Sequence, residues 1–135
     1  MDAPAAESVN PVGIAFGGIS SSEPSNQSAA LIEGNVISMS GSDIGIEAYG
    51  AAVTPTIPVE SVLRINKNII TGTSYGILVD DHVFDVNFSG NTLSGDGVPG
   101  SGDKGIFSAA QCTRTKGKPN KISGYDTDID DTGCP

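Results

Sequence analysis

The only histidine of the chain lies between carboxylates, in the segment Val79-Asp-Asp-His-Val-Phe-Asp85. An imidazole that titrates near neutral pH, next to a carboxylate, can act as a general acid or base. The apolar stretch that precedes Asp81 and His82 predicts a strand, so both residues are expected at a bend. A basic residue beside them in a groove would favour catalysis, and the alternative interpretation is a solvated turn with a polar histidine.

A second candidate for chemistry is the acidic run Asp126-Thr-Asp-Ile-Asp-Asp131. Asp126, Asp128 and Asp130 alternate as in the first half of a calcium-binding loop. However, Asp131 stands where such a loop has its sharp-turn glycine, and no bidentate glutamate follows. If the run is a strand instead, the three aspartates share its outer face, and Thr127 and Ile129 point inward. Calcium is the one cofactor that the sequence suggests, because it contains no phosphate-binding loop, no Cys/His metal cluster and no nucleophile motif.

The two cysteines, Cys112 and Cys134, are 22 residues apart near one end of the chain. A disulfide over that span would contribute about 3 kcal/mol, and two free thiols are the alternative. Because the chain is rich in Gly, Ser and Asn, we predict the disulfide and an extracellular or cell-surface location. No leader is visible in this sequence, so either the protein is cytosolic or a leader or larger upstream region has been removed; we predict the second. No apolar stretch is long enough to span a bilayer, so no membrane insertion is predicted.

The net charge is −9, with 16 acidic and 7 basic residues. Nucleic acids and anionic membrane surfaces are bound through basic patches, so this balance argues against both kinds of partner. It suits a secreted protein, a cation-binding surface or simple solubility.

A sequence repeat indicates the fold that must position all these residues. The pattern Asn, any residue, Ile or Leu, then Ser or Thr occurs four times, beginning at Asn35, Asn68, Asn91 and Asn120. The dipeptide Gly-Ile begins at Gly13, Gly45, Gly76 and Gly105, in steps of 32, 31 and 29 residues. Self-similarity at such a period indicates a solenoid, a propeller or another repeat array.

Apolar residues have fixed offsets from each Asn. They stand five and three positions before it, and again two positions after it; examples are Leu63, Ile65 and Ile70 around Asn68. Alternating apolar residues lie on one face of a strand, and Asn favours a tight turn because it tolerates a left-handed backbone. Each repeat therefore reads as strand, Asn turn, strand, followed by a further strand that the Gly-Ile opens. The last copy differs, because Asp128 replaces the glycine and the segment 113–119 replaces the upstream strand, as expected of a terminal repeat.

These repeats resemble the parallel β-helix repeat of the pectate-lyase and polygalacturonase superfamily, over roughly residues 13–130. The resemblance implies an all-β domain at 13–135, a right-handed parallel β-helix of about four to five coils, with residues 1–12 as a tail or linker. It also implies that the asparagines of the four tetrapeptides stack as one ladder. Three Gly-, Pro- and Ser-rich loops, Ser20–Ser28, Ala51–Val59 and Gly95–Lys104, are expected to flank a groove.

The segment from Tyr75 to His82 is similar to the Tyr-Gly-Phe-Asp-Pro-His motif of mannuronan epimerases, which are also β-helical. Asp81 and His82 match that motif, whereas Tyr75 is two residues too far away and the proline is absent. In those enzymes a lysine neutralises the uronate, a role that the resemblance gives to Lys67 or Arg64. The candidate catalytic residues are thus Asp81, His82 and Lys67, and the candidate carbohydrate-binding residues are Tyr49, Arg64 and Tyr75.

A stack of this size is only roughly 20–25 Å long. The enzymes of the superfamily have more coils and a longer groove, so size favours a non-catalytic structural or carbohydrate-binding module. A polysaccharide lyase or uronate epimerase fragment that uses Asp81 and His82 is the alternative. A homo-oligomer joined through the ends of the β-helix is a third hypothesis, because an uncapped stack exposes strand edges.

Overall fold

The computed structural model describes residues 12–17, 28–40, 43–49, 61–80, 83, 85–98, 100, 102–110, 112–131 and 133–134. The candidate catalytic residues Asp81 and His82 lie outside these ranges, as do most of the predicted loops at 20–28 and 51–59. Nearly all of the predicted tail at 1–12 also lies outside them, so its assignment stays a prediction.

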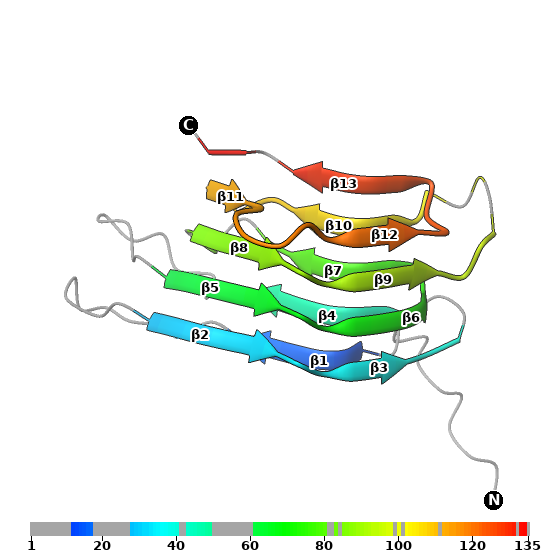
Figure 1. Ribbon diagram of the computed structural model, residues 1–135, viewed down its shortest axis with the longest axis horizontal. Coiled ribbons are helices and arrows are strands. Elements are labelled where there is room, and N and C mark those ends of the chain that lie inside the picture. The colour runs from blue at the N-terminus through cyan, green and yellow to red at the C-terminus, as the bar shows by residue number, and fades with distance from the viewer. Residues whose placement is uncertain are drawn as a thin grey trace, which may run out of the picture.

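The described regular structure is entirely β, in three parallel sheets (Figure 1). Sheet A contains β1 (Val12–Gly17), β4 (Ile44–Tyr49), β7 (Tyr75–Val79), β10 (Lys104–Ser108) and β13 (Thr127–Asp131). Sheet B contains β2 (Ser28–Glu33), β5 (Ser61–Asn66), β8 (Asp85–Ser89) and β11 (Cys112–Arg114). Sheet C contains β3 (Val36–Ser38), β6 (Ile69–Thr73), β9 (Thr92–Gly95) and β12 (Lys121–Ser123).

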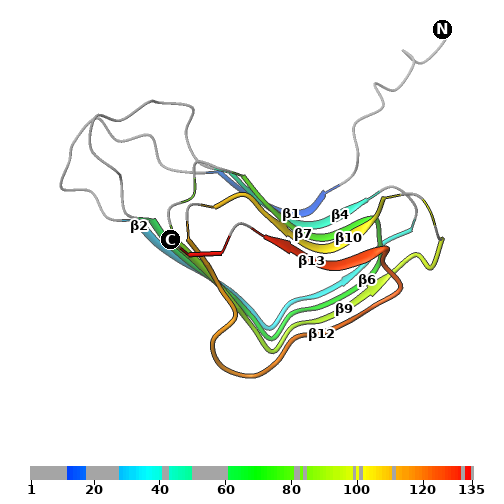
Figure 2. The same cartoon turned by 90° about the horizontal axis from the view of Figure 1, so that it is seen from above.

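The chain visits the three sheets in turn, so every coil adds one strand to each sheet. Seen along the stack, the sheets form the sides of a triangle, and sheet A bows toward the interior (Figure 2). This arrangement confirms the predicted all-β fold, a parallel β-helix.

The core consists of apolar columns that run along the stack. In sheet A, the register places Ile46, Ile77 and Ile106 above one another, and all three are fully buried. In sheets B and C, the residues at the offsets predicted from the asparagines, such as Ile65 and Ile70, are equally buried. Because one coil cannot bury its own apolar face, stacking is what makes this core continuous.

The glycine of each Gly-Ile step is required by packing against neighbouring coils. A Cβ on Gly45 would lie 2.5 Å from Cγ2 of Ile70 and 2.6 Å from the carbonyl oxygen of Gly76. The glycine position and the following isoleucine both face the interior, so the inside–outside alternation shifts by one residue at this point. For that reason Thr127, which we expected to point inward, is exposed. Asp128 occupies the equivalent position in the last coil, where its side chain is also exposed.

The last coil retains a strand in sheet B, which corrects the prediction that 113–119 replaces it. The strand β11 pairs with β8 and places Thr113 in the core column, with 6% of its surface exposed. The sequence did not indicate this strand because its buried residue, Thr113, is polar and not apolar. Its hydroxyl is satisfied by Ser108, whose Oγ lies 2.8 Å from Oγ1 of Thr113.

Candidate functional site

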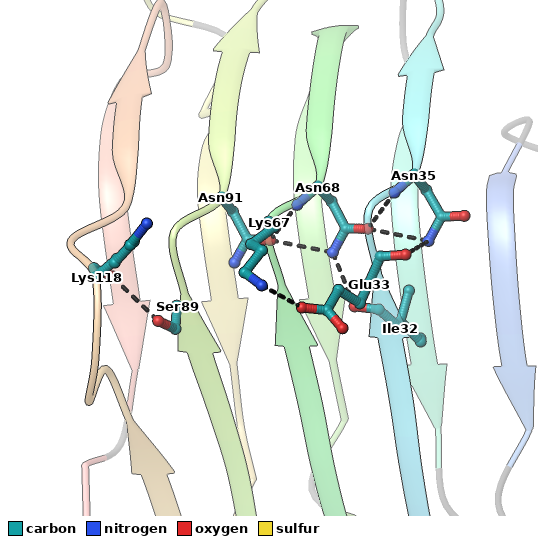
Figure 3. A network of polar contacts seen from close by, with 8 residues as sticks. All are labelled: Ile32, Glu33, Asn35, Lys67, Asn68, Ser89, Asn91 and Lys118. Carbon is teal, nitrogen blue, oxygen red and sulfur yellow. Dashed lines mark hydrogen bonds and ion pairs between the residues drawn. The ribbon is translucent and has the colours of Figure 1, made fainter.

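The four repeated asparagines form one continuous hydrogen-bonded row at the corner between sheets B and C. Figure 3 shows the first three of them, Asn35, Asn68 and Asn91. The amide oxygen of Asn68 accepts hydrogen bonds from the backbone N–H and the Nδ2 of Asn35, each at 3.0 Å. The Nδ2 of Asn68 donates to Oδ1 of Asn91 at 3.1 Å and to the carbonyl oxygen of Ile32 at 3.0 Å. The same pattern continues from Asn91 to Asn120. These residues are occupied in holding coils together, so they are scaffold.

The backbone of the corner differs from the prediction in one respect. The left-handed residue is the one before each asparagine: Gly34, Lys67 and Gly90 have φ of 72°, 54° and 66°. The asparagine itself is selected for its amide, which bonds across coils. In the fourth coil Pro119 stands before Asn120, and proline cannot adopt a positive φ.

The outer face of sheet A is concave (Figure 2), and β7 and β10 contribute apolar and aromatic residues to this sheet. Leu78 lies between the fully buried Ile77 and Val79, so its own side chain points outward, and Phe107 on β10 is its register partner. Tyr75 pairs in register with Lys104 at the beginning of the same two strands. All four side chains are half-buried.

Charged groups border this patch. The Nζ of Lys104 lies 4.7 Å from the centroid of the Phe107 ring and also pairs with the carboxylate of Asp130. An ammonium over an aromatic face is attracted by the ring quadrupole. Glu47, half-buried on β4, is the register partner of Leu78 on the other side. We call Glu47, Tyr75, Leu78, Lys104, Phe107 and Asp130 the sheet A patch.

The structure separates the three predicted carbohydrate-binding residues. Tyr75 belongs to the sheet A patch, whereas Tyr49 stands at the far end of β4, with 45% of its surface exposed. Arg64 is exposed on sheet B, between the buried Leu63 and Ile65. The sequence analysis identified Tyr75 but missed Leu78 and Phe107. These two could have been identified because each stands between two inward-facing residues of a strand that begins with Gly-Ile.

The third predicted catalytic residue, Lys67, can be compared only with the described Asp85, which follows the segment of Asp81 and His82 in the sequence. Asp85 begins β8 and pairs with Val62, while Lys67 follows the end of β5. Five residues of strand separate the two positions, about 16 Å. Lys67 pairs instead with Glu33 at 2.9 Å, and this hydrogen bond and charge raise the pKa of its ammonium. Catalysis by Asp81 and His82 stays a prediction.

The three aspartates proposed for calcium have three different environments. The carboxylate of Asp126 accepts the backbone N–H groups of Gly100 and Gly102, at 3.0 and 2.6 Å, and so anchors the β9–β10 loop. Asp130 pairs with Lys104, and Asp128 is exposed at the last coil. Among the described residues, no group of three or more His, Cys, Asp or Glu side chains is arranged to hold a metal ion.

Tyr125 is an interior residue that the sequence analysis did not single out. Its hydroxyl lies 2.8 Å from Oγ1 of Thr73, two coils away, and burial is the main cause that raises the pKa of its phenol. The ring fits because the coil between has no side chain there: a Cβ on Gly95 would lie 2.9 Å from Cδ1 of Tyr125. The feature of the sequence that could have indicated this packing is the glycine at position 95, which leaves room for the ring.

The predicted disulfide between Cys112 and Cys134 is confirmed. It attaches the end of the described chain to β11, beside a backbone hydrogen bond from Thr113 N–H to the carbonyl oxygen of Gly133, at 3.2 Å.

The predicted loops occupy two different corners. Gly95–Lys104 connects sheet C to sheet A, whereas 20–28 and 51–59 fall between strands of sheets A and B. The three segments are therefore not at equivalent positions in their coils. The two corners lie at opposite ends of the strands of sheet A.

No protein-family model, curated protein or solved structure matches this chain. Among the described residues, no helix is long and apolar enough to cross a membrane.

Proposed function

We propose that the protein is a non-catalytic carbohydrate-binding module of a secreted or surface protein, with a β-helix of the pectate-lyase superfamily type, and that the sheet A patch binds the sugar chain. The observation that carries this proposal is the placement of Tyr75, Leu78 and Phe107 on two adjacent strands of one concave sheet. Binding sites for small organic groups combine apolar and aromatic surface with a few polar groups that fix orientation.

The charges around the patch favour an uncharged glycan. Glu47 and Asp130 bring two carboxylates to the face, and Lys104 is already paired with one of them. A polyuronate would meet like charge at this patch, whereas a neutral sugar can hydrogen-bond to carboxylates and stack on the rings. The disulfide supports an oxidising, extracellular setting.

The test is affinity electrophoresis against neutral polysaccharides, followed by calorimetry on the best ligand. We expect Tyr75→Ala and Phe107→Ala each to weaken binding about tenfold, equivalent to about 1.4 kcal/mol. Tyr49→Ala is the matched control, because it removes an exposed aromatic ring from the same sheet but outside the patch.

Equal losses in all three variants, or no binding of any neutral glycan by the wild-type protein, would contradict the proposal. Thermal melting of each variant shows whether the fold is retained. Release of unsaturated uronate from a polyuronate would instead show that the protein is a lyase.

A further inference from the structure

The basic residues of this acidic chain are collected on one side of the β-helix. All seven Lys and Arg residues are among the described positions, and only Lys104 lies on sheet A. The other six are exposed on sheet B, at the corner between sheets B and C, or at the beginning of β12; they are Arg64, Lys67, Arg114, Lys116, Lys118 and Lys121. We call these six residues the basic face.

The fold places these side chains in rows along the stack. Arg64, Asn87 and Arg114 are register partners on β5, β8 and β11, so the two arginines stand about 10 Å apart, two strand spacings. The amide of Asn87 bonds the backbone N–H and carbonyl of Lys116, which holds the basic segment after β11 against sheet B.

A second row lies at the corner between sheets B and C. A Cβ on Gly90 would lie 3.6 Å from Cγ of Lys67 and 3.5 Å from Cβ of Lys118, so these two lysines flank the glycine from adjacent coils. Figure 3 shows both lysines beside the asparagine row.

The acidic residues of the described part lie mainly elsewhere. Of eleven such residues, only Glu33 and Asp85 share this side, where they pair with Lys67 and Arg114. Six basic and two acidic residues leave the described basic face with a net charge of +4. Of the other nine carboxylates, Asp80 follows β7 at the corner between sheets A and B, and the remaining eight lie on sheet A or at its corner with sheet C. Packed sheets are about 10 Å apart, so the core keeps the carboxylates of sheet A about one Debye length at 0.1 M salt from the basic side chains.

We propose that the basic face binds a polyanionic polysaccharide, a carboxylated or sulfated chain that lies along the coil stack. This site is distinct from the sheet A patch and does not depend on it. A single sugar chain is narrow enough to follow the rows of Arg64 and Lys118 and to stay on the opposite side of the core from most of the acidic residues.

Two observations favour a polysaccharide over the other polyanions. A DNA duplex or a membrane presents dense charge over a wide area and would also meet the carboxylates of a chain with a net charge of −9. Single-stranded nucleic acids are bound by stacking on aromatic side chains. The described strands of sheet B contribute one aromatic residue, Phe88, and it is fully buried.

The test is calorimetric titration of the intact protein with polygalacturonate and with dextran sulfate, with uncharged dextran as the reference, at low and at physiological salt. We expect both polyanions to bind with an affinity that falls as salt rises, whereas any binding of dextran should be independent of salt and of the basic-face residues. Arg64→Gln and Lys118→Gln should each weaken binding about three- to tenfold, and the double variant further. Lys104→Gln is the charge-matched control, because it removes the one basic residue outside the basic face; it should leave polyanion affinity unchanged.

An equal loss with Lys104→Gln would overturn the proposal, since only net charge would then matter. Absence of binding at low salt, or tighter binding to duplex DNA or to phosphatidylserine vesicles than to either polysaccharide, would also overturn it. The two sites are separable, because Tyr75→Ala should weaken neutral-glycan binding about tenfold and leave polyanion binding intact.

Discussion

The amide of Asn68 is fully buried, and each of its polar atoms has partners in the adjoining coils. A buried amide of this kind stabilises only while every partner is present, because an unsatisfied buried donor or acceptor retains its full desolvation cost. The four offsets in the sequence were sufficient to predict that these asparagines are equivalent. They did not predict that the preceding residue carries the left-handed turn.

We expect Asn68→Ala to lower the free energy of unfolding by about 3 kcal/mol or more, because at least two buried partners are left unsatisfied at about 1–3 kcal/mol each. Asn35→Ala, at the end of the row, should cost clearly less, because its Nδ2 makes only one bond to a neighbouring coil. Urea unfolding of both variants measures the difference. Equal costs would show that the row is not cooperative between coils.

Tyr125 gives the protein an alkaline limit. Burial raises the pKa of its phenol above the ordinary value of 10.0. The folded state thus holds this proton more tightly than the unfolded chain does. The contribution is present in full below about pH 10 and is lost as pH rises through the folded pKa.

Stability should accordingly decline above about pH 10 in the wild type. It should decline less steeply in Tyr125→Phe, although that variant starts lower because Thr73 loses its partner. Thermal melting as a function of pH measures the slopes, and the difference in tyrosinate absorbance between the two proteins reports the titration of Tyr125. If stability declined with pH equally steeply in both proteins, ionisation of Tyr125 would not be coupled to unfolding.

Among the elements, the strands with apolar cores were predictable and β11 was not. The offsets around each asparagine identify positions such as Leu63 and Val86 because burial demands an apolar residue there. In β11 the core position is Thr113, whose hydroxyl is satisfied by Ser108, a residue five positions earlier that the sequence gives no reason to pair with it.

The disulfide should stabilise this last coil in particular. Replacing both Cys112 and Cys134 with alanine removes a loop closure over 22 residues, and we expect a loss of about 3 kcal/mol. In hydrogen exchange, the amide of Thr113, bonded to Gly133, should lose protection before amides of the central coils do. Uniform loss along the whole stack would contradict this local role.

At the scale of the whole molecule, the last coil carries charge on an otherwise open strand edge. Asp128 and Asp131 on β13 are exposed, and part of the core is incompletely covered there, with Ile129 exposed at 39%. Carboxylates on an edge strand oppose pairing with another chain. We therefore expect these charges to oppose, at this end of the stack, the end-to-end oligomerisation that the repeat suggests.

The double variant Asp128→Asn, Asp131→Asn should therefore self-associate more strongly than the wild type, as measured by sedimentation velocity. Glu47→Gln, Asp96→Asn is the control, because it makes the same change in net charge away from the open edge. Association of both double variants to the same degree would assign the effect to net charge alone.

The sequence by itself determined the architecture of this protein, because burial and the asparagine corners impose the same residue types at the same offsets in every coil. It also determined the cysteine pair, through composition and spacing. Only the tertiary structure decided which chemistry-bearing residues meet. It paired Lys67 with Glu33, and it placed Tyr75 and Leu78 on β7 beside Lys104 and Phe107 on β10.

The distribution of charge was also decided only by the tertiary structure. A net charge of −9 is a sum over the chain and does not say on which face of the fold each charge lies. Folding places successive coils in register, so that basic residues spread over 58 positions, from Arg64 to Lys121, reach one side of the stack while most described carboxylates reach the others. The repeat fixes the faces, and the non-repeating residues decide what each face can bind.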